Sequence, residues 1–202
     1  RPLSTRRRCI LGRETALQQL VWKEDGWPWL AHGNNRPLLS VPAPDLPEYT
    51  FEDHPIRDNF DSPVLGLDYQ TLRIPLGEDM LSLTERPGYL RLKGAESLRS
   101  RNRQSLVARR QQAFCYTAVA CLEFEPETSQ QMAGMVCYYN MSSFYYLKVT
   151  RDEALGKCLG VDVCAHGKYE ELTDATFAIP DGVRVFLRAD LDYNRLQFSY
   201  SL

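Results

Sequence analysis

The stretch from residue 133 to residue 150 reads AGMVCYY-NMSS-FYYLKVT and is the part of the sequence that decides the fold. Its two halves, 133–139 and 144–150, are rich in β-branched and aromatic residues, which favour extended strands. The four residues between them, 140–143, are of the kind that form a short hairpin loop. The sequence therefore predicts an antiparallel hairpin at this point.

Two further hairpins are predicted toward the C-terminal end. The strand-like run 160–164 leads into the turn His166-Gly167-Lys168, and the runs 183–189 and 196–200 are joined across residues 192–194. Several short strands separated by turn clusters are typical of an antiparallel sandwich and not of a βαβ fold. We therefore expect an all-β protein.

Immediately before the first hairpin, residues 114–124 read FCYTAVACLEF. Apolar side chains occupy both the even-numbered and the odd-numbered positions of this run, which face opposite sides of a strand. This is the pattern of a strand covered on its two faces. We expect this strand to be buried on both sides inside a sandwich.

The N-terminal part of the chain has a different character. Residues 21–30 read VWKEDGWPWL, and the Asp25-Gly26 pair between apolar runs predicts another hairpin. Residues 41–47 read VPAPDLP, with three prolines in seven positions, which is typical of a semi-rigid linker. We expect a domain boundary there.

Composition excludes several classes of protein. The 202 residues suit one or two domains, and 44% hydrophobic and 25% charged residues are ordinary values for a soluble globular protein. No apolar run approaches the roughly 18 residues that a membrane span requires. The formal net charge is −2, whereas a protein that neutralises phosphates carries a positive excess. Neither membrane nor nucleic acid is an expected partner.

Three local patterns admit a functional and a structural interpretation. The arginine-rich stretch 99–110 could contact nucleic acid, but in a near-neutral protein a solvated or ion-paired surface is the expected role. The tryptophans at positions 22, 27 and 29 and the tyrosines of the 138–146 hairpin could stack on sugar rings. Cross-strand packing explains both aromatic groups equally well, and we expect packing.

No metal or cofactor site is predicted. The six cysteines contain no C-x-x-C pair, and the three histidines lie far apart in the sequence. No catalytic triad or glycine-rich phosphate loop is present either. Because most cysteines lie in apolar strand-like runs, we expect buried, reduced thiols and a cytoplasmic location. The cysteines are Cys9, Cys115, Cys121, Cys137, Cys158 and Cys164.

The order of several segments resembles glycoside hydrolase family 43, the β-xylosidase and α-arabinofuranosidase group. Residues 11–15 (LGRET), followed by Val21-Trp22 and Asp25-Gly26-Trp27, are similar to the last blade of that family's β-propeller. Later segments are similar to its C-terminal concanavalin A-like sandwich. These are residues 69–73 (YQTLR), 86–92 (RPGYLRL), 104–111 (QSLVARRQ), 132–140 (MAGMVCYYN) and 149–153 (VTRDE).

The resemblance implies that no catalytic residue lies in this chain. In that family two aspartates and a glutamate act from propeller blades that precede this region, and inverting hydrolysis needs two opposed carboxylates. We therefore expect the fragment alone to be inactive. Arg13 is similar to an arginine that faces the sugar in the substrate pocket, and it is the one predicted substrate-binding residue. A salt bridge within the blade is the alternative role for Arg13.

The resemblance also divides the chain. Residues 1–40 are expected to be a remnant of the last propeller blade, 41–47 a linker, and 48–202 a concanavalin A-like antiparallel sandwich. Apolar alternation in Arg195–Leu202 continues to the final residue, which predicts that the sandwich is truncated there. Its unpaired edge predicts association between chains.

The expected function is that of an accessory C-terminal region of a β-xylosidase. The intact enzyme would remove terminal β-1,4-xylosyl residues from xylo-oligosaccharides with inversion, and this region would support the active site and subunit assembly. Its expected partners are the upstream propeller, the oligosaccharide bound by the intact enzyme and further copies of the chain. The alternatives are a carbohydrate-binding, lectin-like module and a purely structural or oligomerisation domain.

Overall fold

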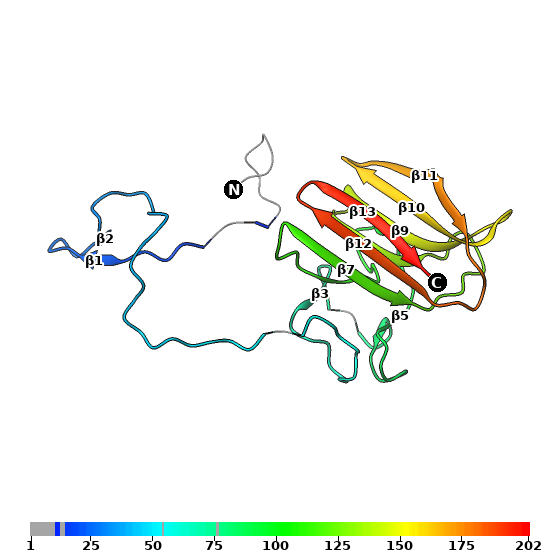
Figure 1. The fold of residues 1–202 in the computed structure, drawn as a ribbon, viewed down its shortest axis with the longest axis horizontal. Coiled ribbons are helices and arrows are strands. Elements are labelled where there is room, and N and C mark those ends of the chain that lie inside the picture. The colour runs from blue at the N-terminus through cyan, green and yellow to red at the C-terminus, as the bar shows by residue number, and fades with distance from the viewer. Residues whose placement is uncertain (1–10, 13–14, 54, 76) are drawn as a thin grey trace. The chain divides into compact units, whose positions relative to one another are not determined.

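The computed structural model describes residues 11–12, 15–53, 55–75 and 77–202 (Figure 1). The described residues form strands and no helix, so the all-β prediction is confirmed. The chain divides into two compact units, Arg1–Arg57 and Asp58–Leu202.

The described residues of the first unit contain one short hairpin. Strand β1 (Leu20–Trp22) pairs with β2 (Pro28–Leu30) in antiparallel register, as the sequence predicted. Gly26 has a φ of 79°, which favours glycine, and its N–H donates to the carbonyl of Lys23 over 2.9 Å. The predicted linker 41–47 lies within this unit, and residues 41–53 contain no strand.

Two sheets form the body of the second unit, and all their strand pairs are antiparallel. The larger sheet has the order β11-β10-β9-β8, and the smaller one has the order β13-β12-β7. The larger sheet consists of β8 (Ala133–Asn140), β9 (Ser143–Asp152), β10 (Gly156–Ala165) and β11 (Lys168–Ala178). The smaller sheet consists of β7 (Cys115–Leu122), β12 (Val185–Asp192) and β13 (Arg195–Ser201). All three predicted hairpins are confirmed.

The hydrophobic core lies between these two sheets. Val149 and Leu159 face each other across β9 and β10, and Leu187 of β12 packs in the same cluster. Burial of such apolar surface is the main term that stabilises a domain of this size. The remaining buried members of this cluster are Leu147, Ile179 and Val185.

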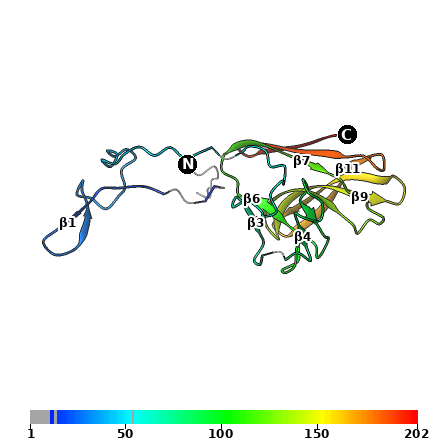
Figure 2. The ribbon, with the colours of Figure 1, turned by 90° about the horizontal axis from the view of Figure 1, so that it is seen from below.

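The opposite face of the larger sheet is covered by the segment that precedes β7. Figure 2 shows the green strands β3, β4 and β6 on the side of the yellow strands away from β12 and β13. The Arg99 guanidinium lies 5.8 Å from the Tyr169 ring centroid, which fixes part of this cover. The cover contains two short ladders: β3 (Tyr69–Thr71) pairs with β6 (Val107–Arg109), and β4 (Leu81–Ser82) pairs with β5 (Arg91–Leu92).

One glycine is required inside the larger sheet. Gly134 of β8 pairs with Lys148 of β9, and a Cβ added there would overlap the carbonyl oxygen of Leu147. The two strands therefore approach at a distance that no other side chain permits.

The expectation that residues 114–124 are buried on both faces is wrong. Val119 and Cys121 of β7 lie on the outer face of the smaller sheet, and Val119 is 59% exposed. The run looked doubly buried because Val, Thr and Cys suit a strand regardless of burial. One face of an antiparallel sheet can lie in water, and that is the case here.

The thiol prediction is correct only in part. The five described cysteines are free, but Cys115 and Cys121 are exposed and Cys137 is half-buried. Cys158 and Cys164 are buried in β10. Cys115 and Cys121 are exposed because they lie on the outer face of β7. The sequence pattern did not show that this face is open to water. Cys9 lies outside the described residues.

Candidate functional site

A cleft lies where β7 ends and β12 begins. Both strands are held in register up to the pair Val185–Leu122, so the residues that follow β7 and precede β12 stand side by side. The cleft has a volume of about 450 Å³. It is lined by Arg86, Glu123, Phe124, Glu125, Gly182, Val183 and Arg184.

Glu123 is the centre of one charged group in this cleft. Arg86 Nη1 donates to its carboxylate over 2.6 Å, and the Tyr89 hydroxyl donates over 2.9 Å. Arg184 Nε lies 2.7 Å from the same carboxylate. The hydrogen bonds from Arg86 and Tyr89 lower the pKa of Glu123 from 4.5 to about 2. The Arg86 guanidinium also lies 3.7 Å from the Tyr89 ring centroid, so it is held from two sides.

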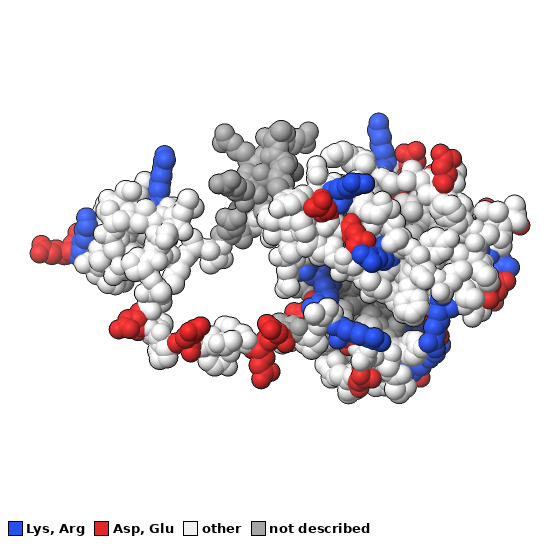
Figure 3. Space-filling model, viewed as in Figure 1, with Lys and Arg blue, Asp and Glu red and all other residues white. Residues whose placement is uncertain are grey.

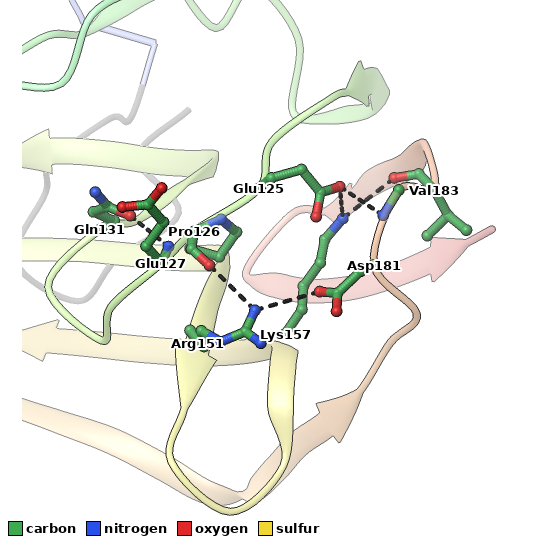
Figure 4. A network of polar contacts seen from close by, with 9 residues as sticks. Glu125, Pro126, Glu127, Gln131, Arg151, Lys157, Asp181 and Val183 are labelled. Atoms are coloured by element: carbon green, nitrogen blue, oxygen red, sulfur yellow. Dashed lines mark hydrogen bonds and ion pairs between the residues drawn. The ribbon is translucent and has the colours of Figure 1, made fainter.

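Glu125 is the centre of a second group (Figure 4). The Lys157 side chain is 0% exposed, and its Nζ lies 2.6 Å from Glu125 Oε1. The Gly182 N–H donates to the same oxygen over 2.9 Å. This arrangement ties the segment after β7 to β10 and to the loop before β12. A buried ammonium requires such a partner, because an unpaired charge in the interior is costly.

Arg151 completes this network from β9. Its Nη1 lies 3.3 Å from the Pro126 carbonyl and 3.3 Å from Asp181 Oδ1 (Figure 4). In the same segment, Gln131 Oε1 accepts the Glu127 N–H over 2.6 Å. The polar contacts therefore fix the segment 123–131, which connects the two sheets.

Both carboxylates of the cleft are engaged in ion pairs. Glycoside hydrolysis needs one carboxyl that is protonated and one that is ionised. With a pKa of about 2, Glu123 is ionised near neutral pH and has no proton to donate. Glu125 is held by Lys157 and by a backbone N–H. The chemical capacity of the cleft is hydrogen bonding and ion pairing.

A second polar cluster is buried between the larger sheet and its cover. Lys148 Nζ lies 2.8 Å from Asp162 Oδ1 and 3.5 Å from Glu171 Oε1. The Tyr169 hydroxyl donates to Asp162 Oδ2 over 2.7 Å. Burial and the neighbouring Asp162 carboxylate raise the pKa of Tyr169 well above its usual range. The cluster lies on the same face of the sheet as the buried apolar side chains of Phe144 and Cys164.

The aromatic residues named from the sequence occupy different surroundings. Tyr138 stacks on Phe144 across β8 and β9 with ring centroids 6.0 Å apart, which confirms cross-strand packing at that pair. Tyr139 and Tyr145 are exposed. Trp22 and Trp27 are 76% and 70% exposed, so the first unit does not bury them within itself.

Four of the five arginines of the 99–110 stretch have partners within the second unit, Arg99 through the Tyr169 ring. Arg103 pairs with Asp79 over 3.4 Å, and Arg109 pairs with Asp68 over 3.0 Å. Arg110 Nε donates to Gln70 over 3.3 Å. On the face drawn in Figure 3, acidic and basic side chains are interspersed over this unit. These contacts match the expected ion-paired surface.

The predicted substrate-binding residue, Arg13, lies outside the described residues. Within the part of the chain that the structure describes, no group of three or more His, Cys, Asp or Glu side chains could hold a metal ion. A search of the same residues for a helix with the length and apolarity to cross a membrane found none.

The cleft and the buried cluster were both missed by the sequence analysis. The cleft joins residues from positions 86, 123 and 184. Pairing of β7 with β12 brings the last two together, and the ion pair with Glu123 brings Arg86 to them. For the buried cluster a signal existed: Lys148 interrupts the apolar run of β9, and Asp162 interrupts that of β10. Charged residues in the middle of central strands indicate a buried pair.

Comparison with known proteins gives the family. The family described as the β-xylosidase C-terminal concanavalin A-like domain matches residues 57–202. A β-xylosidase of Bacillus subtilis is 41% identical over 195 residues, which are 96% of this chain and 36% of that protein. A xylan 1,3-β-xylosidase of a Vibrio species is 44% identical over 96% of this chain and 35% of that protein. The chain therefore spans about a third of the length of these relatives.

Solved structures agree with this assignment. The xylan β-1,4-xylosidase of Bacillus halodurans C-125 superposes with a TM-score of 0.90 at 45% identity, covering 96% of this chain and 37% of that one. A family 43 protein of Bacillus licheniformis superposes with a TM-score of 0.80 at 33% identity, covering 96% and 36%. The chain thus belongs to glycoside hydrolase family 43 and contains the C-terminal concanavalin A-like domain of its β-xylosidases.

Proposed function

We propose that this chain is the accessory C-terminal region of an enzyme that removes terminal β-1,4-xylosyl residues from xylo-oligosaccharides with inversion. In this proposal the first unit completes the last blade of a catalytic propeller, and the sandwich braces that propeller. The observation that carries the proposal is the contrast in burial between the two units. The sandwich has its own core, whereas the first unit leaves its large apolar side chains in water.

The exposed apolar residues of the first unit favour a missing partner. Trp22, Trp27 and Leu39 are 76%, 70% and 109% exposed. Large apolar side chains left in water in this way favour an interaction site. A hairpin with two three-residue strands cannot form a core alone. Neighbouring propeller strands would cover these side chains.

The chain alone is proposed to be catalytically inactive. Its cleft carboxylates, Glu123 and Glu125, are engaged in ion pairs, and one of them has a strongly lowered pKa. The carboxylates for hydrolysis would come from the propeller. Measurable turnover of an aryl β-xyloside by the purified chain, abolished by mutation of one of its own carboxylates, would contradict this assignment.

A chimera tests the accessory role directly. The 195-residue matched region of the Bacillus subtilis β-xylosidase is replaced by this chain, and kcat/KM for xylobiose is compared with that of a version lacking the region. We expect activity with the graft and loss of activity without it. If the truncated enzyme is fully active, the region does not support the active site.

The same chimera tests Arg13. Charge-assisted hydrogen bonds in a desolvated pocket are strong, so Arg13→Ala is expected to lower kcat/KM by about one to three orders of magnitude. The melting temperature should stay close to that of the unmutated chimera. Parental kinetics, or a large loss of thermal stability with activity per folded molecule intact, would assign Arg13 to a salt bridge within the blade.

Association of the 202-residue chain with further copies is proposed to use the open edge of strand β13. Among the described strands β13 pairs only with β12, so its other edge offers free backbone N–H and C=O groups. We expect concentration-dependent association in light scattering, and Tyr200→Pro should reduce it, because it removes an N–H that points away from β12 and disfavours strand addition. A stable monomer at high concentration would contradict this part of the proposal.

A further inference from the structure

We propose that the cleft between the end of β7 and the start of β12 is a second, non-catalytic binding site for neutral xylo-oligosaccharides. The inference goes beyond the accessory role, because the site would bind sugar without the propeller. Only the choice of sugar rests on the proposed function.

The cleft offers hydrogen-bond donors that the protein does not use. Arg86 and Arg184 are 47% and 62% exposed along their side chains, and both are positioned by Glu123. Within the described residues, neither Nη atom of Arg184 donates a hydrogen bond, and Arg86 uses only Nη1. These groups line the cleft already oriented, so a ligand would not have to order them.

The cleft also offers an unused acceptor. Lys157 and the Gly182 N–H both contact Glu125 Oε1, and Figure 4 shows no contact to the other oxygen of that carboxylate. Oε2 of Glu125 has no donor among the described residues, and the side chain is 52% exposed. A sugar hydroxyl can donate to such an oxygen while it accepts from a guanidinium.

The free carboxylate oxygen of Glu125 favours a neutral ligand over an anion. Two guanidinium groups and two carboxylates line the cleft, and the Lys157 ammonium behind them is buried against Glu125. An added carboxylate would meet the free oxygen of Glu125. Hydroxyl groups match both the donors and the acceptor, so a saccharide fits better than an acidic ligand.

The size and the apolar wall agree with a saccharide. A volume of about 450 Å³ lies in the range of small-ligand sites. Phe124 and Val183, both partly buried against the core, line the cleft beside the charged groups. A pyranose ring presents a C–H face together with hydroxyls, and an aromatic or apolar wall beside planar polar groups suits it.

The test is a titration of the isotope-labelled 202-residue chain with xylotriose, followed by amide chemical shifts. We expect saturable shifts at Glu125, Gly182 and Val183 with a dissociation constant of about 1 mM, the weak affinity of an open site with few contacts. Absence of saturable shifts up to about 20 mM, or shifts confined to other surfaces, would overturn the inference. Equal binding of glycerol at the cleft would also overturn it.

A matched pair of variants locates the site. Arg184→Leu removes the free donors but leaves Glu123 with Arg86 and Tyr89, and it should weaken xylotriose binding at least about fivefold. Arg103→Leu is the control, because that side chain is also 62% exposed and ion-paired but lies outside the cleft. Unchanged binding by Arg184→Leu, with the native spectrum retained, would contradict the assignment.

The binding test for the cleft and the chimera test for the accessory role can fail separately. A chimera that hydrolyses xylobiose while the chain fails to bind xylotriose would overturn the second site alone. Binding at the cleft in a chain whose chimera is inactive would support the site and contradict the accessory role. If Arg184→Leu does not fold, the shift map of the unmutated chain decides the question.

Discussion

Two hairpins of this chain share a sequence pattern, but one is buried and the other is exposed. The β1–β2 hairpin and the β8–β9 hairpin both combine aromatic strands with a polar turn, and both were predicted from that pattern. In β9, Phe144 is 2% exposed and Val149 is 0% exposed, whereas Trp22 of β1 is 76% exposed. Strand pairing is determined by local sequence, but burial depends on what packs against the hairpin.

The difference has a physical basis in the number of covering layers. The β8–β9 hairpin is part of a four-stranded sheet with the β7–β12–β13 sheet on one face and the segment before β7 on the other. The β1–β2 hairpin has three residue pairs, and no second layer covers it among the described residues of its unit. A two-stranded hairpin is marginally stable in water without such cover. One unit therefore has its own core, whereas the described hairpin of the other leaves large apolar side chains exposed.

The largest loss of unfolding free energy is expected when the buried ion pair of the larger sheet is broken. Lys148→Met leaves the Asp162 carboxylate, whose side chain is 2% exposed, without its ammonium partner. Removal of one member of a buried pair costs about 3–5 kcal/mol of unfolding free energy. Urea denaturation followed by circular dichroism measures this loss.

The double variant Lys148→Met/Asp162→Leu is the control for that prediction. Replacement of both charges by apolar groups is often neutral or stabilising, so most of the loss should be recovered. A single variant that unfolds like the unmodified chain would show that the pair is not buried in solution.

A smaller loss of unfolding free energy is expected when a side chain of the core between the two sheets is truncated. Leu159→Ala creates a cavity beside Val149 and should lower the unfolding free energy of the sandwich by about 3 kcal/mol. Trp22→Ala, at an exposed position of the other hairpin, should change it by less than about 0.5 kcal/mol. Equal losses in the two variants would mean that Trp22 is packed against the sandwich core.

The smallest of the three effects is a pH dependence of stability that arises from Glu123 in the cleft. The pKa of Glu123 is lowered from 4.5 to about 2 in the folded chain, so its stabilising contribution is present above pH 4.5 and lost as the pH falls to about 2. As the pH is lowered between these two values, the melting temperature of the Glu123→Gln variant should therefore fall less than that of the unmodified chain. Parallel curves for the two proteins would contradict the lowered pKa.

Most of the fold could be predicted because the signals are local. The hairpins at 133–152, 156–178 and 185–201 follow from alternating apolar residues and from turn residues such as Gly167. The exposed outer face of β7 could not be predicted in this way. Whether Val119 meets a second layer is a property of the whole sheet arrangement, and the residue type is compatible with both outcomes.

The candidate site was predictable to a smaller degree. The family resemblance identified the kind of enzyme and Arg13, which lies outside the described residues. The cleft depends on Arg86, Glu123 and Arg184, which are separated by up to 98 positions along the chain and meet only in the folded domain. Single-sequence patterns contain no distance information of that range.

The contrast between the two units can be tested most directly by their own fluorescence. All three tryptophans, at positions 22, 27 and 29, lie in the first unit, so tryptophan emission reports on that unit alone. Far-ultraviolet circular dichroism is dominated by the strands of the sandwich. Both signals are recorded along one urea titration of the 202-residue chain. The account predicts a cooperative transition in circular dichroism, with tryptophan emission already at the wavelength of water-exposed indole and unchanged throughout. Blue-shifted native emission that changes in the same single transition would contradict it, because the first unit would then be buried without a partner.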